Sequence, residues 1–143
     1  IGLTNVEDIA EATRIIDRIE KVPFTKTESD LKELGLNAEN ISTLQSFISE
    51  RSSNTETLAF LEGLEGSETF KTGVAELKEV TETMCLLGVA EENYKIDVKI
   101  ARGLDYYTGT VYETQLIGHE DLGSICSGGR YENLASAFCN QEL

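Results

Sequence analysis

The sequence has few basic residues, and this scarcity excludes nucleic-acid binding through a large positive charge. The chain of 143 residues contains 12 lysines and arginines against 26 aspartates and glutamates, so its formal net charge is −14 at pH 7. It has no basic tract of the kind that attracts nucleic acid through bulk charge. Any contact with RNA must therefore be local, or must depend on parts of a protein outside these residues.

Cysteine and histidine are also scarce. The chain has 3 cysteines and 1 histidine, and no two of them have the spacing of a zinc motif. We interpret the cysteines as packing residues in a reducing, cytoplasmic setting, and we predict no metal site. No apolar run approaches the roughly 20 residues that cross a bilayer, and the first residues lack the features of a signal peptide. We therefore expect no contact with a membrane.

What the sequence does contain is a set of amphipathic segments before about residue 90. Hydrophobic residues make up 40% of the chain, which is enough for a packed core. They recur at helical spacing between capping residues. The pattern predicts helices over residues 4–20, 27–36, 37–50, 52–66 and 67–88. Thr4 or Asn5 is expected to cap the first helix, and Thr27 or Ser29 the second. The longest segment carries an apolar stripe that we interpret as core packing, made of Phe70, Val74, Leu77, Val80, Met84 and Leu87.

Near residue 90 the period of the pattern changes from 3.6 to 2. Residues 94–101 alternate between apolar and polar side chains, and residues 110–117 are rich in Thr, Val and Tyr, so both segments are predicted strands of one antiparallel hairpin. A turn, a short strand at 124–127 and a short helix at 131–138 are expected to follow. The predicted fold class is α+β, with one boundary near residue 90.

Polar residues that suit a small ligand gather around the predicted hairpin. An arginine fork matches phosphate or carboxylate oxygens two at a time, and a tyrosine orders its ring and hydroxyl with little loss of entropy. The pair Gly128 and Gly129 lets a flat ligand approach the main chain. From spacing alone, the favoured interpretation at this point is a well-packed hairpin with no ligand, in which an arginine pairs with Asp105. The candidate side chains are Arg102, Asp105, Tyr106, Tyr107, Arg130 and Tyr131.

Two stretches of this region resemble the histidine-specific motifs of histidyl-tRNA synthetases. "ARGLDYYTGTVYE" (101–113) is similar to the first motif, and "SGGRYENL" (127–134) is similar to the second. Residues 1–90 are loosely similar to the helical insertion domain of that family. The resemblance implies a helical insertion domain over residues 1–90, followed over residues 91–143 by an antiparallel hairpin segment of a class II synthetase catalytic domain.

The resemblance also implies a reaction. Histidine and ATP, with magnesium as the counter-ion of ATP, give histidyl-adenylate and pyrophosphate, and the histidyl group is then transferred to its tRNA. The full-length enzyme would be a cytoplasmic homodimer. By the family pattern Arg102 is the catalytic residue, which reaches the α-phosphate and stabilises the charge developing there.

The remaining implied site residues form the pocket for histidine. Tyr107 and Tyr131 would contact the substrate imidazole, and Tyr106 would help to shape the same pocket. Gly128 and Gly129 would form its floor. A site built to hydrogen-bond a polar group rejects amino acids that lack that group.

The sequence also departs from the family pattern. Tyr112 and Glu132 replace the commoner phenylalanine and aspartate. The family's motifs 1, 2 and 3 do not occur in these residues, so we expect an internal fragment that is inactive alone. One alternative is the synthetase-like regulatory subunit of ATP phosphoribosyltransferase, which generally lacks so large an insertion. A second alternative is an interaction module, in which the hairpin is only a scaffold.

Overall fold

The computed structural model describes residues 3, 5–19, 21–101 and 107–132. The chain forms two compact units. The first unit comprises Ile1–Glu50 and Asp97–Arg102, and the second comprises Arg51–Ile96 and Gly103–Leu143. This division groups two helices with the strands, whereas the sequence pattern changes only near residue 90. The insertion-domain boundary at residue 90 therefore stays a prediction.

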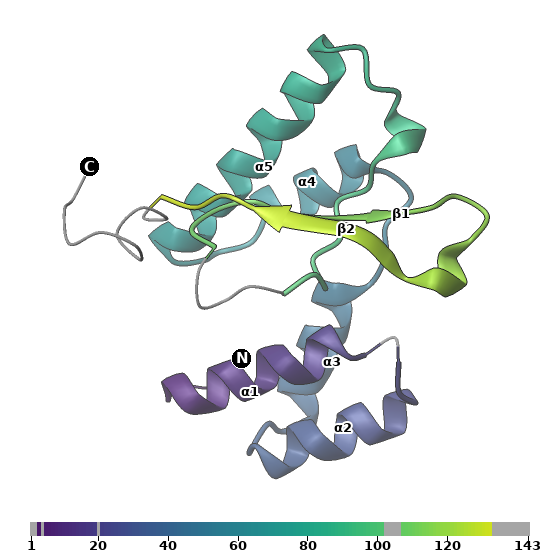
Figure 1. Ribbon diagram of the computed structural model, residues 1–143. Coiled ribbons are helices and arrows are strands. Elements are labelled where there is room, and N and C mark those ends of the chain that lie inside the picture. The colour runs from purple at the N-terminus through teal and green to yellow at the C-terminus, as the bar shows by residue number, and fades with distance from the viewer. Residues whose placement is uncertain (1–2, 4, 20, 102–106, 133–143) are drawn as a thin grey trace, which may run out of the picture. The chain divides into compact units, whose positions relative to one another are not determined.

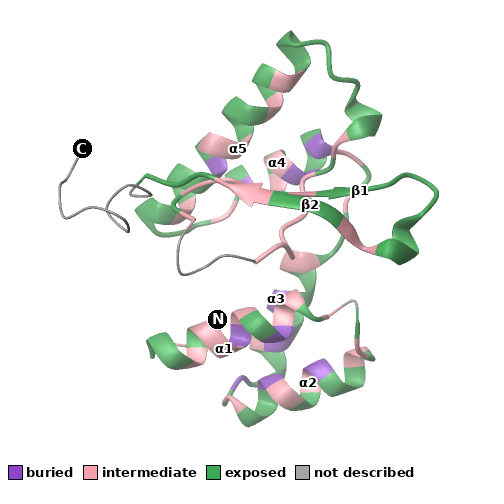
Figure 2. Ribbon diagram, viewed as in Figure 1, coloured by how far each residue is buried: buried purple, intermediate pink, exposed green. Residues whose placement is uncertain are grey.

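The first unit contains three helices, α1 (Val6–Asp17), α2 (Phe24–Glu33) and α3 (Ala38–Ile48) (Figure 1). The side chains of Asn5 and Asn37 accept hydrogen bonds from the first turns of α1 and α3, as the sequence predicts. Figure 2 colours the buried positions of this unit purple. Its buried apolar side chains form one core, made of Ala12, Ile15, Leu31, Leu36, Ile41 and Leu44.

The start of α2 differs from the prediction. Neither Thr27 nor Ser29 caps the helix, because it begins at Phe24, directly after Pro23. The φ of Pro23 is −59°, which suits a residue that leads into a helix and has no N–H to satisfy. Thr27 is instead fully buried within the helix. At its other end α2 stops at Glu33, short of the predicted residue 36, and Gly35 follows with a φ of +90° that favours glycine.

The second unit contains the helices α4 (Asn54–Glu62) and α5 (Glu68–Leu86), capped by the hydroxyls of Ser53 and Ser67. The expectation that the whole apolar stripe of α5 packs into a core is wrong in this structure. Val74 is buried, whereas Leu87 is 76% exposed. With 9 residues against the 19 of α5, α4 alone is too short to cover the whole stripe.

The same unit contains the two strands, β1 (Val111–Gln115) and β2 (Ser124–Gly129), which pair antiparallel. Val111 lies opposite Gly129 and Tyr112 opposite Gly128. A turn containing the short 3-10 helix η2 (Glu120–Leu122) joins the strands. Helices followed by an antiparallel pair confirm the α+β class. No helix in the described ranges is long and apolar enough to span a bilayer.

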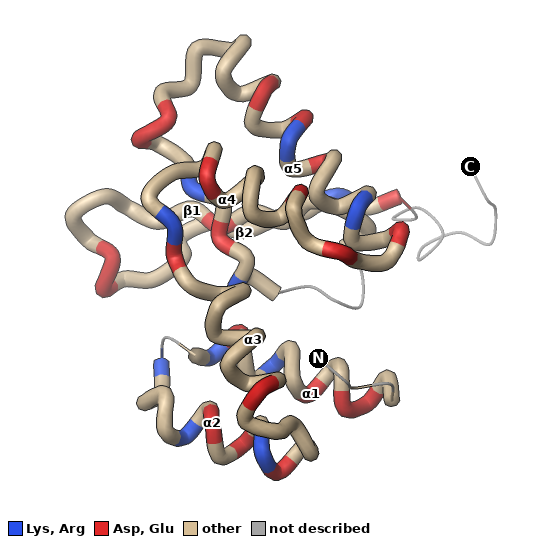
Figure 3. Tube along the Cα trace, turned by 180° about the vertical axis from the view of Figure 1, so that it is seen from behind, with Lys and Arg blue, Asp and Glu red and all other residues tan. Residues whose placement is uncertain are grey.

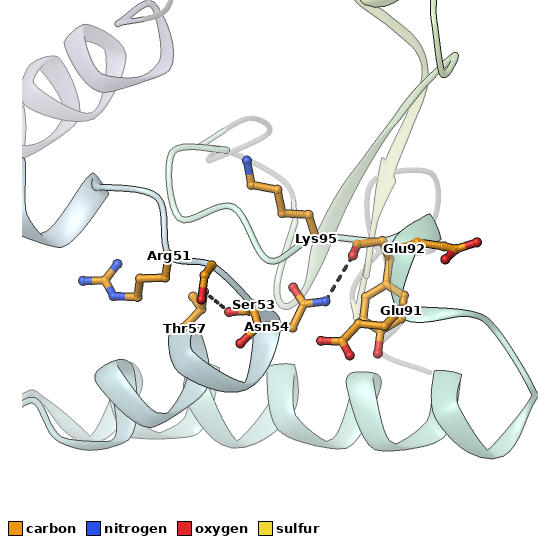
Figure 4. A pocket seen from close by; sticks show the side chains of 9 residues that line it. Arg51, Ser53, Asn54, Thr57, Glu91, Glu92 and Lys95 are labelled. Atoms are coloured by element: carbon orange, nitrogen blue, oxygen red, sulfur yellow. Dashed lines mark hydrogen bonds between the residues drawn. The ribbon is translucent and has the colours of Figure 1, made fainter.

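The predicted hairpin at about 95–117 is wrong in its first strand. Residues 94–101 form no strand, and the hairpin joins residues 111–115 to 124–129. The buried side chain of Asn54 meets the main chain here, donating through Nδ2 to the oxygen of Tyr94 at 3.1 Å and accepting at Oδ1 from the N–H of Ile96 at 2.7 Å. One side-chain amide thus takes the place of a neighbouring strand (Figure 4). The predicted helix at 131–138 lies outside the described residues from position 133 onward.

Candidate functional site

Four of the six predicted site residues lie in the described part of the chain: Tyr107, Gly128, Gly129 and Tyr131. Arg102 and Tyr106 lie outside it, as does Asp105. The hairpin brings the two motifs together. The N–H of Thr108 donates to the oxygen of Arg130 at 2.8 Å, and the N–H of Arg130 donates to the oxygen of Thr110 at 3.2 Å. Because the strands are antiparallel, residues two dozen positions apart in the sequence become neighbours.

The tyrosines of the two motifs are in direct contact. The ring centroids of Tyr107 and Tyr131 lie 5.0 Å apart, with their planes at 70°, an edge-to-face arrangement. Tyr131 is 41% exposed, so part of this ring is accessible to solvent. The two rings could therefore contact the same small ligand.

The glycine pair gives room to tyrosine rings. A Cβ added to Gly129 would lie 2.6 Å from carbons of the Tyr107 ring, and one added to Gly128 would collide with the ring of Tyr112. Successive residues of a strand face opposite sides, so the two rings lie on opposite faces of β2. From the sequence, this space is predicted to admit a ligand. In the structure tyrosines lie closest to it, and the role of the pair as a pocket floor stays a prediction.

Arg130 links the hairpin to α5. Its guanidinium lies 3.0 Å from Glu76 of α5 and 2.5 Å from Glu132, measured between nitrogen and carboxylate oxygen. Gly109 makes room for this arrangement, since an added Cβ would lie 3.0 Å from Cδ of Arg130 and 3.1 Å from Oε2 of Glu76. Arg130 is a candidate from the sequence, whereas Glu76 is not, because one glutamate among the several of a helix carries no local signal.

A pocket of about 400 Å³ lies elsewhere in the second unit, at the start of α4 (Figure 4). None of the four described site residues lines it. Its two buried polar side chains already have partners, Asn54 as given above and Thr57 through a hydrogen bond to the oxygen of Ser53. At the same helix start, the hydroxyl and the N–H of Ser52 donate to Glu56 and lower the pKa of its carboxyl. This pocket is therefore explained by the capping of α4.

The charges of the described residues offer neither a metal centre nor a basic surface. No group of three or more His, Cys, Asp or Glu side chains within the described ranges could hold a metal ion. Figure 3 shows the lysines and arginines scattered among the more numerous acids on each unit. Electrostatic attraction of a polyanion by these residues would therefore have to be local.

Comparison with known proteins identifies the class to which these motifs belong. The family model for histidyl-tRNA synthetase matches residues 6–143. The chain belongs to the histidyl-tRNA synthetase family, which confirms the resemblance seen in the two motifs.

Individual relatives agree with this assignment. The chain is 45% identical over 141 residues to the histidine–tRNA ligase of Clostridium tetani, and the match covers 98% of this chain and 32% of that protein. It is 42% identical to the histidine–tRNA ligase of Nostoc punctiforme, over all of this chain and 31% of that one. The crystal structure of histidyl-tRNA synthetase from Nostoc sp. PCC 7120 superposes with a TM-score of 0.91 at 43% identity, covering 97% of this chain and 33% of that one. The chain thus spans about a third of the length of the relatives it matches.

Proposed function

We propose that these residues form part of a histidine–tRNA ligase, which activates histidine with ATP and transfers it to its tRNA. The observation that supports this most is the contact between Tyr107 and Tyr131, one from each histidine motif, with ring centroids 5.0 Å apart. The relatives reported above are named as ligases, which favours the ligase over the regulatory subunit of ATP phosphoribosyltransferase.

In the first step of this reaction a carboxylate oxygen of histidine attacks the α-phosphorus of ATP. A new oxygen–phosphorus bond forms as the bond to pyrophosphate breaks, so the products are histidyl-adenylate and pyrophosphate. Negative charge builds up on the α-phosphate oxygens in the transition state. The guanidinium of Arg102 is proposed to meet that charge with two parallel N–H donors.

Recognition of histidine is proposed to depend on the tyrosine pair. The hydroxyls of Tyr107 and Tyr131 would hydrogen-bond the imidazole, while Tyr106 would shape the pocket and Gly128 and Gly129 would form its floor. An amino acid without a ring nitrogen would cover these hydroxyls and leave them unpaired, which is a strong form of rejection.

Magnesium, a second subunit and tRNA belong to the proposal for the longer protein. Magnesium enters this proposal as the counter-ion of ATP. The homodimer and the cytoplasmic setting follow the family pattern. With a net charge of −14, these residues would meet tRNA through local contacts.

We predict that Tyr107→Phe and Tyr131→Phe, made in the longer protein, each weaken the use of histidine. Phenylalanine keeps the ring contact and removes only the hydroxyl, so each change should cost about 0.5–1.5 kcal/mol for a neutral hydrogen bond. The two hydroxyls would share one network, so the double variant should depart from additivity. The measurement is steady-state kinetics with histidine varied and ATP saturating.

Tyr112→Phe serves as the matched control. The Tyr112 ring lies on the opposite face of β2 from Tyr107. The substitution also restores phenylalanine, the residue commoner in the family at this position. Its kinetics should equal those of the parent. If the other two single variants and their double also match the parent within about twofold, roughly 0.4 kcal/mol, the imidazole pocket is not built from these tyrosines.

A further inference from the structure

The ion pair between Arg130 and Glu76 connects α5 to the end of the hairpin. Arg130 is the residue between Gly129 and Tyr131. We infer that Glu76 and Arg130 are positioning residues, which set the affinity for histidine by fixing the two tyrosine rings from α5. This inference rests on the proposed function, since it assigns a role within that same site.

Arg130 is fixed through its main chain and through its side chain. Its N–H and oxygen bond to Thr110 and Thr108 across the hairpin, at 3.2 and 2.8 Å. Its guanidinium bonds to Glu76 at 3.0 Å. Arg130 is therefore held by hydrogen bonds to three residues, Thr108, Thr110 and Glu76, that lie outside this segment.

The neighbours of Arg130 are the residues on which the tyrosine contact depends. Gly129 precedes it and lies against the ring of Tyr107, and Tyr131 follows it and supplies the second ring. A shift of the Arg130 main chain would therefore displace both rings together. Small displacements of a positioned group have large effects on a site that needs a fixed geometry.

The two carboxylates that meet Arg130 are not equivalent. Glu132 is two residues away and its side chain is 55% exposed, so this pair moves with the segment. Glu76 is 54 residues away on α5, and its side chain is only 27% exposed. Of the two carboxylates, only Glu76 can hold this segment in place against a separate helix. Gly109 leaves the space through which the two side chains approach.

An ion pair of this exposure contributes little to folding, so its effect should appear in the site and not in stability. In the longer protein, Glu76→Gln keeps the size of the side chain and removes its charge. We expect the KM for histidine in ATP–pyrophosphate exchange to rise about 3–10-fold, within the range for coupled neighbours. The kcat should stay within about twofold and the melting temperature should be unchanged.

Glu62→Gln is the matched control. It breaks the ion pair of Glu62 with Lys78, which joins α4 to α5 in the same unit at 2.8 Å. Glu62 raises the pKa of Lys78 through this hydrogen bond, and neither residue belongs to the hairpin. Its KM for histidine should equal that of the parent. Arg130→Gln should resemble Glu76→Gln, and the double variant should add little to either.

The outcomes separate the inference from the proposed function. A longer protein with no histidine-dependent exchange would overturn the proposed function, and the inference with it. Normal exchange in the parent, with the KM of Glu76→Gln within about twofold, would overturn the inference alone. An equal rise in Glu62→Gln would also overturn it, because the effect would then be general. Should Glu76→Gln fail to fold, Glu76→Asp, which keeps the charge but shortens the side chain, is expected to raise the KM in the same direction, and an unchanged KM would contradict the inference.

Discussion

Arg102→Ala in the longer protein is expected to slow histidine-dependent ATP–pyrophosphate exchange by about 10²–10³, the range for loss of one preorganised donor to a developing charge. Arg102→His should have a similar effect, because an imidazole lacks the two-donor fork that fits phosphate. The KM for histidine should move less, since the charge on the α-phosphate appears mainly in the transition state. Initial rates at saturating ATP, with histidine varied, give both quantities.

Arg14→Ala provides the control for this experiment. Arg14 lies on α1, its side chain is 68% exposed and it pairs with Glu11 at 3.1 Å, so its loss should leave the exchange rate unchanged. An Arg102→Ala enzyme with a normal exchange rate and a much higher KM for histidine would contradict the role assigned to Arg102. The arginine would then bind the substrate and not the transition state.

Leu31→Ala is expected to destabilise the first unit by about 2–5 kcal/mol, the cost of removing a buried leucine side chain and leaving a cavity. Leu31 is 1% exposed and lies in the core shared by α1, α2 and α3. A loss of this size is a large part of the stability of a small domain. Urea unfolding of the 143-residue chain, followed by far-ultraviolet circular dichroism, measures the change in midpoint.

Leu86→Ala makes the same chemical change at an exposed site of the same chain. Leu86 is the last residue of α5 and is 87% exposed, so its loss should change stability by less than about 0.5 kcal/mol. Equal midpoints for the two variants would show that the described core does not carry the stability of the first unit.

The helices could be predicted because their signals are local. Asn37 caps α3 and Ser67 caps α5, and each cap acts on an N–H three residues away. Gly88, with a φ of +76°, follows the end of α5 where the sequence places it. Such features need no knowledge of distant residues.

Two of the failures, at residues 94–101 and in the stripe of α5, occurred where a distant partner decides the outcome. Residues 94–101 alternate as a strand should, but the side chain of Asn54, 42 residues before Ile96, binds the main chain at this point. The stripe of α5 has a regular helical period, yet how much of it is buried depends on the length of α4. Periodicity shows which face is apolar, but not what covers it.

Only part of the candidate site could be predicted, because some of its contacts also depend on distant partners. The two motifs identify Tyr107 and Tyr131 by type and spacing, and the contact of their rings follows from the hairpin. The role inferred for Glu76 had no sequence signal, because the residue that it pairs with lies 54 positions away. The opening at Gly109 is understood only once both side chains are placed.

Histidine-dependent ATP–pyrophosphate exchange, measured for the longer protein and for the 143-residue chain with each of the standard amino acids, tests the account most directly. The longer protein is expected to exchange with histidine and with no other amino acid at a comparable rate. The 143-residue chain is expected to show none, because the family's motifs 2 and 3 do not occur in it. Exchange by the longer protein with a different amino acid, or with none, would contradict the proposed function. Exchange by the 143-residue chain alone would show that these residues already form a complete activating site.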